Sequence, residues 1–221
     1  MKYKLLLTLA ICFFLNNSNA QMENDASKEL PDLFIKVYGG ISPLLSEDYE
    51  LRSPVQNFDF TYDHDVGYNA GLSVGYFLTD NIAVQTGFET SENRVFIKYF
   101  GSFSGQLSQL STKLKTNTFY LNGMYVFNRN NTFNPYVGVG ASYINSATYE
   151  FFGEEFDDSG FFGFRLTAGF DYKLHDKWAI NFEINNSFMG EIDFNEDRFT
   201  QFTFEFMPLT INAGVVYSIT L

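Results

Sequence analysis

Eight segments of the chain alternate between apolar side chains at one parity and small or polar side chains at the other. In one of them, Ile180, Phe182 and Ile184 alternate with Asn181 and Glu183. The segments span 33–41, 68–78, 82–88, 119–127, 137–143, 162–174, 178–188 and 209–221. A period of two is expected for a β-strand whose two faces meet different surroundings. The pattern therefore predicts an all-β protein of eight strands.

The alternation alone leaves open which face points outward. A soluble eight-stranded barrel would place the apolar set inside and cover its outer face with Lys and Glu. Here the second face is mostly Gly, Asn, Ser and Thr, as in Asn69, Gly71, Ser73 and Gly75. Such a composition suits the narrow lumen of a barrel whose apolar face meets lipid. We predict an eight-stranded antiparallel up-and-down transmembrane β-barrel, with a soluble barrel or sandwich as the alternative.

Short and long connections alternate between these segments. The short ones are 79–81, 128–134 and 175–177, and the long ones lie near 43–66, 90–116, 145–160 and 190–206. Short turns at one rim and long loops at the other are the arrangement of outer-membrane barrels. The loop lengths therefore favour the transmembrane alternative.

Aromatic side chains are placed at both ends of the predicted strands. Those at the short-turn end are Tyr76, Phe127, Tyr172, Trp178 and Tyr217, and those at the long-loop end are Tyr68, Phe88, Phe119, Tyr143, Phe162 and Phe188. Aromatic residues are enriched at the two interfaces between a membrane and water. We expect these residues to form two aromatic girdles.

The first twenty residues have the pattern of a secretory signal peptide. Lys2 and Lys4 precede an apolar run over 5–15, and Ser18 and Ala20 occupy small-residue cleavage positions. The run is shorter than the roughly 20 residues that a membrane-spanning helix needs. We expect cleavage after Ala20, a short periplasmic segment over 21–32, and an outer-membrane barrel domain over 33–221.

The charge of the chain limits which partners it can bind, and its cysteine content limits how the fold can be stabilised. The chain has 14 Lys and Arg against 26 Asp and Glu, which gives a net charge of -12. Such a chain lacks the excess of positive charge that binds phosphate backbones, so a nucleic-acid partner is excluded. Its one cysteine, Cys12, falls within the expected signal peptide. An exported chain without disulfides must be held by packing and backbone pairing.

Several stretches together resemble a known family. They are FIKVYGG over 34–40, NPYVGVGA over 134–141, LHDKWAI over 174–180 and the amphipathic closing strand. With these, the region from Leu33 to Leu221 resembles the small eight-stranded outer-membrane proteins of Gram-negative bacteria, the OmpA/OmpX/OmpW-like barrels sometimes described as porin-like or surface-antigen proteins. The resemblance implies an architecture and a location in the outer membrane; it does not imply a chemistry.

Six charged residues fall on the inward parity of the predicted strands: Lys36, Glu89, Arg165, Asp171, Lys173 and Glu183. The lumen of an eight-stranded barrel is only wide enough for side chains, and buried charges must be paired. We expect a plug of paired charges, in which Arg165 is within reach of Glu89 or Glu183 while Lys36, Asp171 and Lys173 form a lower layer. A polar pore is the alternative.

Other candidate chemistry in the sequence is weak. The loops carry two acidic clusters, Asp59, Asp63, His64 and Asp65 in the first and Glu150, Glu154, Glu155, Asp157 and Asp158 in the third. Neither has the spacing of a metal-binding loop. We expect solvated acidic loops, with no metal and no cofactor. Hydrolysis by a Ser-His pair needs a histidine near the serine, and the only histidines are His64 in a loop and His175 in a short turn. A lipid-modifying enzyme is therefore a residual hypothesis.

These observations favour a structural, surface-exposed barrel over an enzyme. Its long loops would make surface contacts or mediate adhesion, and the alternative is an OmpW-like passive channel for small solutes. The expected partners are outer-membrane lipids and lipopolysaccharide, the outer-membrane insertion machinery, and an extracellular or host partner that the loops contact.

Overall fold

The computed structural model describes residues 33–43, 60–64, 66–100, 107–151, 154–189, 191–196, 200–205 and 207–220. The signal peptide expected over 1–20 and the segment expected over 21–32 lie outside these residues. Within the described ranges, no helix is long and apolar enough to cross a membrane.

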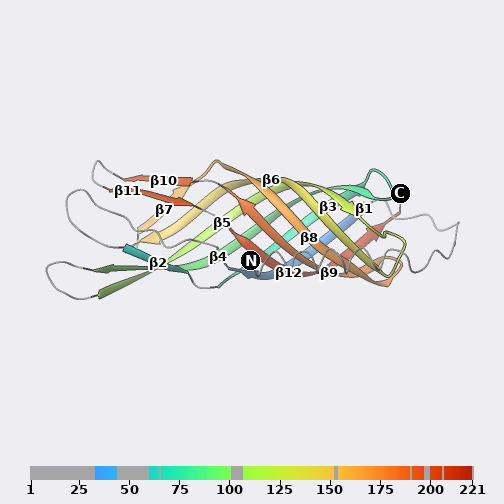
Figure 1. Ribbon diagram of the computed structural model, residues 1–221, viewed down its shortest axis with the longest axis horizontal. Helices are drawn as coiled ribbons and strands as arrows, with labels where there is room; N and C mark the ends of the chain where they lie inside the picture. The colour runs from blue at the N-terminus through green and yellow to red at the C-terminus, as the bar shows by residue number, and fades with distance from the viewer. Residues whose placement is uncertain are drawn as a thin grey trace, which may run out of the picture. The chain divides into compact units, whose positions relative to one another are not determined.

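The described chain is built from β-strands (Figure 1). They are β1 (Leu33–Ser42), β2 (Phe60–His64), β3 (Gly67–Phe77), β4 (Ile82–Phe100), β5 (Leu107–Val126), β6 (Phe133–Phe151), β7 (Glu154–Asp158), β8 (Phe161–His175), β9 (Trp178–Phe188), β10 (Glu191–Glu196), β11 (Thr200–Glu205) and β12 (Leu209–Ile219). Eight of them, β1, β3, β4, β5, β6, β8, β9 and β12, pair in chain order into a ring.

Two pairings close this ring. β1 pairs with β12 from Leu33↔Ile219 to Ile41↔Ile211, and β4 pairs with β5 along its whole length. Every pairing between neighbours in the ring is antiparallel. The predicted eight-stranded antiparallel up-and-down barrel is confirmed.

Three strands are longer than the alternation indicated. β4 has 19 residues, β5 has 20 and β6 has 19, whereas a tilted strand crosses a bilayer with about 9–11 residues. The connection expected over 90–116 is mostly strand, because β4 and β5 keep pairing as far as Phe100↔Leu107. β2 extends the sheet beside β4, and β7 extends it beside β6, while β10 and β11 pair with each other. The wall therefore continues well beyond one membrane crossing at the long-loop end.

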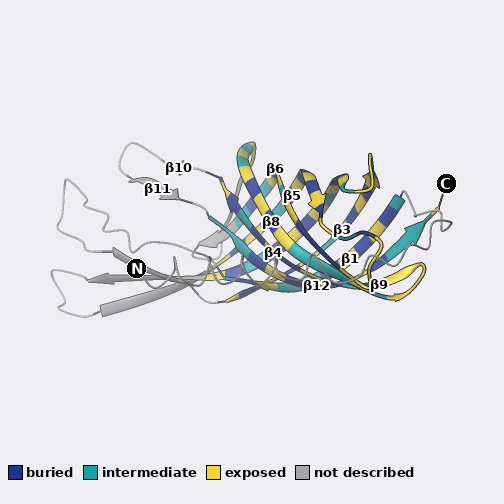
Figure 2. Ribbon diagram, turned by 45° about the vertical axis from the view of Figure 1, so that its right-hand side comes forward, coloured by how far each residue is buried: buried dark blue, intermediate teal, exposed yellow. Residues whose placement is uncertain are grey.

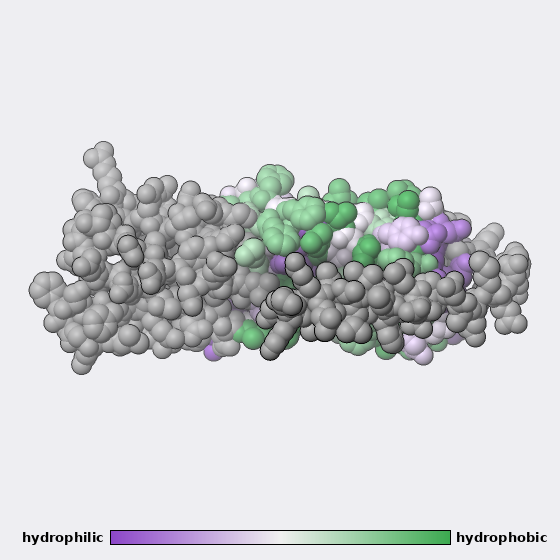
Figure 3. All heavy atoms as spheres, viewed as in Figure 1, coloured by the Kyte–Doolittle hydropathy of each residue, from purple (hydrophilic) through white to green (hydrophobic). Residues whose placement is uncertain are grey.

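Burial alternates along the strands as the sequence predicted (Figure 2). Val37, Leu72 and Ile184 are exposed, whereas their neighbours Lys36 and Ser73 are at most 2% exposed. Hydrophobic residues cover much of the described surface in Figure 3. The apolar parity faces outward and the polar parity faces the lumen, which is the arrangement of a barrel in lipid.

The outward parity can be tested at Ala168, in the middle of β8. Its register partners Val137 and Ile184 are both exposed. Ala168→Arg should lower the free energy of unfolding by about 2–4 kcal/mol, because a cation near the bilayer midplane loses its hydration. Ala168→Leu, the matched control, should change it little. Urea unfolding in phosphatidylcholine vesicles measures both, and equal stability of the two variants would contradict the outward orientation.

Candidate functional site

The first buried ion pair of the lumen joins β1 to β9. Lys36 Nζ donates to Glu183 Oε2, and both side chains are almost completely buried. Tyr136 OH donates to the same oxygen at 2.7 Å, and Asn185 Nδ2 donates to Glu183 Oε1 at 2.9 Å. The carboxylate thus receives donors from β1, β6 and β9. Such a set of partners is what a buried charge needs in order to be tolerated.

The hydrogen-bond network continues from this pair to Asp171. Asn181 Nδ2 donates to Tyr136 OH at 2.7 Å and to Asp171 Oδ1 at 2.6 Å. Lys173, two residues along β8 from Asp171, donates through Nζ to the carbonyl oxygen of Arg129 at 2.7 Å. Of the lower layer expected from the sequence, Lys36 and Asp171 therefore share one network, while Lys173 binds the short turn between β5 and β6.

The second buried ion pair joins β8 to β4. Arg165 Nη2 lies 3.4 Å from Glu89 Oε2, and the Arg165 guanidinium stacks over the Tyr120 ring at 4.2 Å. Tyr38 OH donates to Tyr120 OH at 3.1 Å. Of the two acids within reach of Arg165 in the sequence, the structure places Glu89 against it, and Glu183 is taken by Lys36.

Amides and hydroxyls fill the lumen between and above the charged groups. The alternation in the sequence placed these residues on the polar face, but it did not identify their partners, which depend on the stagger of the strands. The cross-lumen and cross-strand bonds are Asn69 to Asn212 at 2.7 Å, Gln85 to Ser73 at 2.8 Å, Asn122 to Thr167 at 3.2 Å and Thr167 to Asn185 at 2.8 Å. Buried polar groups that are paired in this way rigidify a packed interior.

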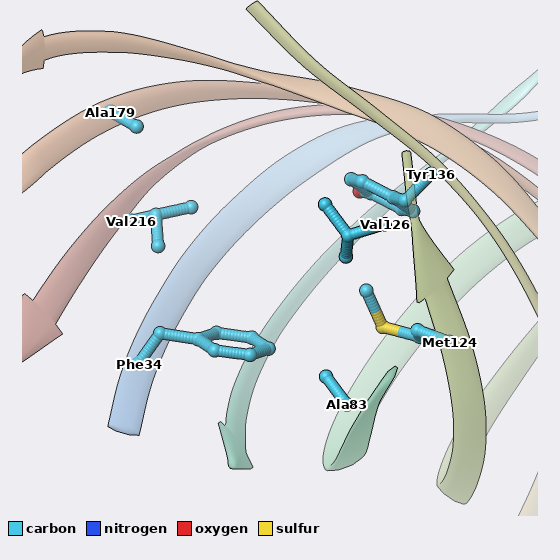
Figure 4. Packing of buried hydrophobic residues seen from close by; sticks show 7 residues of the cluster. All are labelled: Phe34, Ala83, Met124, Val126, Tyr136, Ala179 and Val216. Carbon is cyan, nitrogen blue, oxygen red and sulfur yellow. The ribbon is translucent and has the colours of Figure 1, made fainter. Parts of the chain in front are cut away.

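An apolar layer occupies the lumen at the short-turn end, where the sequence analysis expected only small, polar or charged side chains. Its members are Phe34, Ala83, Met124, Val126, Tyr136, Ala179 and Val216, which converge from several strands in Figure 4. They stand on the inward parity towards the short-turn end of the barrel. The alternation indicated that these residues face inward. An apolar layer was not predicted, because the inward face was expected to be polar throughout.

A residue of a short turn covers this apolar layer. Arg129, in the turn between β5 and β6, is 8% exposed, and its guanidinium stacks over the Phe77 ring at 3.7 Å. Phe77 packs against Phe34, with ring centroids 5.6 Å apart. Sequence reasoning missed Arg129 because a charged turn residue normally points into solvent.

Glycines on the inward parity make room for two lumen tyrosines. A Cβ at Gly71 would lie 2.4 Å from Tyr38 Cζ, and one at Gly87 would lie 2.5 Å from Tyr120 Cζ. Each ring therefore lies over a glycine of a neighbouring strand. This close approach explains why large rings and glycines occur together on the inward face.

The glycine beneath Tyr120 gives a second test of the lumen. Gly87→Val should lower the free energy of unfolding by about 1–3 kcal/mol, because overpacking must displace the Tyr120 ring from Arg165. Gly123→Val is the matched control, since a Cβ there meets only Val139 O at an ordinary 3.8 Å. Urea unfolding in vesicles compares the two variants. A loss at position 123 as large as that at position 87 would contradict tight lumen packing.

A small pocket remains at the loop-side end of the lumen. Its lining includes Glu89, Arg165, Thr210, Ile144 and Met189. It has room for about one water molecule.

The residues expected in the aromatic girdles lie on the outward face. All of them except Tyr143 and Tyr217 are exposed, and those two are half-buried. Rings pair between neighbouring strands, with centroids 5.1 Å apart for Phe88 and Phe119, 4.6 Å for Tyr143 and Phe162, and 4.7 Å for Trp178 and Tyr217. That these rings mark the two membrane interfaces stays a prediction.

The remaining candidate sites are mostly outside the described side chains. Both acidic loop clusters fall there, so the structure does not test them as cation sites. Among described side chains, no group of acidic, histidine or cysteine residues could hold a metal ion. His64 pairs with Val95 at the loop end of the sheet, whereas His175 is exposed beside the turn to Trp178.

Comparison with known proteins places this architecture in the outer membrane. Outer membrane protein W of Vibrio cholerae serotype O1 is 33% identical over 127 residues, which are 50% of this chain and 54% of that protein. The chain thus spans about half the length of that relative. An uncharacterized outer-membrane protein of Sinorhizobium fredii, y4mB, is 27% identical over 197 residues, 82% of each chain.

The chain is also similar to a solved outer-membrane barrel and to a family of such barrels. OprG from Pseudomonas aeruginosa has the same fold, with a TM-score of 0.58 at 16% identity over 86% of this chain and 98% of that one. Residues 46–207 match the family described as outer membrane protein beta-barrel domain. The protein is located in the outer membrane, as the sequence predicted, and the chain belongs to the outer membrane protein β-barrel family.

Proposed function

We propose that this chain is a structural, surface-exposed barrel whose lumen is closed to ions and solutes and whose projecting strands make contacts outside the cell. The observation that carries the proposal is the filled lumen. Two buried ion pairs, Lys36 with Glu183 and Arg165 with Glu89, cross it at successive levels. An apolar layer that Arg129 covers lies at the short-turn end.

These layers obstruct a continuous column of water. An eight-stranded barrel has an interior just wide enough for side chains to fill. Here large side chains fill it, and glycines bring the rings of Tyr38 and Tyr120 closer to the neighbouring strands. An ion would have to separate the buried pairs and then pass apolar groups that cannot replace its hydration shell.

The long strands support a role in surface contacts. β4 and β5 continue for several residues beyond one membrane crossing, and β2 pairs with the outer part of β4 from Phe60↔Tyr99 to His64↔Val95. A hairpin that is paired along its length stays extended and holds its tip away from the membrane. Long loops on the outer side are where such barrels meet their surroundings.

Shortening the hairpin tests the surface role. Arg94 and Lys113 are directly paired, so residues 95–112 can be replaced by Asn-Gly without changing the register of the barrel. Bacteria that display the shortened protein should adhere less to host cells or to one another than bacteria that display the full chain. Equal surface amounts are confirmed by antibody labelling. Unchanged adhesion would overturn the proposed role of this hairpin.

An OmpW-like passive channel is the second candidate function. The likeness to outer membrane protein W and the small pocket at the loop-side end of the lumen favour it. Vesicles that contain the refolded chain should swell in a small sugar no faster than vesicles without protein if the lumen is closed. Swelling that increases with the amount of protein would favour the channel.

We also propose the partners of this barrel. Lipopolysaccharide and other outer-membrane lipids contact the apolar outer face, the insertion machinery assembles the barrel, and an extracellular or host partner meets the loops. We propose no enzymatic activity. His64 and His175 lie on elements at opposite ends of the barrel, so the chain's two histidines do not share a site.

A further inference from the structure

We propose that Arg94, Lys113 and Lys115 form a binding site for the phosphate groups of the outer-leaflet lipid, on the outer face of β4 and β5. All three side chains are exposed. They share the outward parity with Phe88 and Phe119, which are exposed lower on the same two strands. The inference rests on the lipopolysaccharide contact proposed above and on the outer-membrane orientation of the barrel, and it is independent of whether the lumen is closed.

The strand register brings the three cations together. Arg94 is directly opposite Lys113, and Lys115 lies two residues along β5 from Lys113, on the same face. Glu92 is directly opposite Lys115, and its Oε1 lies 3.8 Å from Lys113 Nζ. Among the side chains that the structure describes, this surface, which we call the basic patch, therefore presents three cations and one carboxylate.

The basic patch is positively charged in a protein of negative net charge, and it contains two like charges directly opposite each other on neighbouring strands. The chain has 26 acidic against 14 basic residues, yet among the described side chains of the patch three cations accompany one carboxylate. Like charges directly opposite each other on neighbouring strands are destabilising, as Arg94 and Lys113 are here. An anion between them would remove the repulsion. Arg and Lys are both suited to phosphate, Arg by bidentate hydrogen bonds and Lys as a point charge.

The position of the basic patch points to a lipid headgroup. The outward residues of β4 and β5 are mainly apolar from the pair Ile82↔Tyr125 to the pair Phe88↔Phe119, and Glu92↔Lys115 follows four residues later. Strands of about 9–11 residues cross the hydrocarbon core. A count from Ile82 along β4 thus places the patch at the end of one crossing, just beyond the Phe88 and Phe119 rings.

The occupant that fits this position is a phosphorylated glycolipid. The long-loop end faces outside the cell, where lipopolysaccharide carries phosphate groups beside its acyl chains. Its acyl chains would lie along Phe88, Phe119 and their apolar neighbours while its phosphates meet the cations above them. Basic residues beside an apolar membrane face bind anionic headgroups by this combination of forces.

Binding of fluorescently labelled rough lipopolysaccharide to the full refolded chain, in zwitterionic micelles, tests the proposal by anisotropy. The triple variant Arg94→Gln, Lys113→Gln, Lys115→Gln should weaken binding by about a hundredfold, because each cation near an anionic lipid surface contributes to affinity. Glu92→Gln should strengthen binding. Lys177→Gln, at the short turn between β8 and β9, should have no effect. A folded far-ultraviolet spectrum accompanies each variant, and these exposed residues leave the lumen unchanged.

The outcomes separate the sources of phosphate and the classes of partner. Dephosphorylated lipid A should compete poorly and phosphorylated lipid A well. Equal competition by both, or a loss of less than about threefold in the triple variant, would overturn the site. Full displacement by millimolar inorganic phosphate would replace the lipid with a free anion. Displacement by a sulfated oligosaccharide but not by lipid A would assign the patch to a different polyanion. Channel activity of the same preparation tests the proposed function separately.

Discussion

Replacing Lys36 by Met should lower the free energy of unfolding by about 3–5 kcal/mol. This loss and the loss from replacing Arg165 are the largest effects that we expect of single substitutions. Glu183 would then remain as a buried carboxylate without its cation. Its hydrogen bonds from Tyr136 and Asn185 would persist, but they do not neutralise its charge. Met keeps most of the volume and the apolar contacts of the lysine stem.

A double variant separates loss of the pair from loss of packing. Lys36→Met with Glu183→Gln removes both charges while the Gln oxygen can still accept one hydrogen bond. It should recover a substantial part of the stability, with a positive coupling in the double-mutant cycle. Urea unfolding in vesicles, followed by tryptophan fluorescence of Trp178, provides the four free energies. Additive losses would show that Lys36 and Glu183 act independently.

Replacing Arg165 by Met should also cost about 3–5 kcal/mol if the site is dry, and less if water enters. Arg165 is 1% exposed, and its removal leaves Glu89 uncompensated. It also leaves Tyr120 without the stacked guanidinium. The pocket beside Glu89 and Arg165 has room for about one water molecule, so we expect this loss to be no larger than that of Lys36→Met.

The rescue of the Arg165 variant identifies its partner. Arg165→Met with Glu89→Gln should recover part of the loss, whereas Arg165→Met with Glu183→Gln should be worse than either single change, since Lys36 then loses its carboxylate as well. Unfolding free energies in vesicles measure both. Rescue by the change at 183 instead of the change at 89 would contradict the observed pairing.

The alternation in the sequence was sufficient to predict the ring of strands. A period of two assigns each side chain to a face, and the composition of the polar face indicated which side meets lipid. The alternation also placed Lys36, Glu89, Arg165 and Glu183 inside the barrel. It did not determine which acid meets which base, because partners across a lumen depend on strand stagger, which periodicity does not encode.

Three other features could not be predicted from the sequence, each for a different physical reason. The ring of Tyr120 lies over Gly87, a contact between strands that only the three-dimensional register reveals. Arg129 occupies a turn, where nothing in the local pattern distinguishes a side chain that folds over the lumen from one in solvent. The length of β4 and β5 was underestimated because polar residues on both faces interrupt the alternation beyond the membrane.

Single-channel conductance of the refolded full chain in a planar lipid bilayer tests the central claim most directly. Because Lys36, Arg165 and the apolar layer around Phe34 fill the lumen, the unmodified protein should show no steady open state above the noise of the bare bilayer. A steady channel would contradict the account, most clearly if its conductance changed in Lys36→Met or Arg165→Met while the stability of these variants did not.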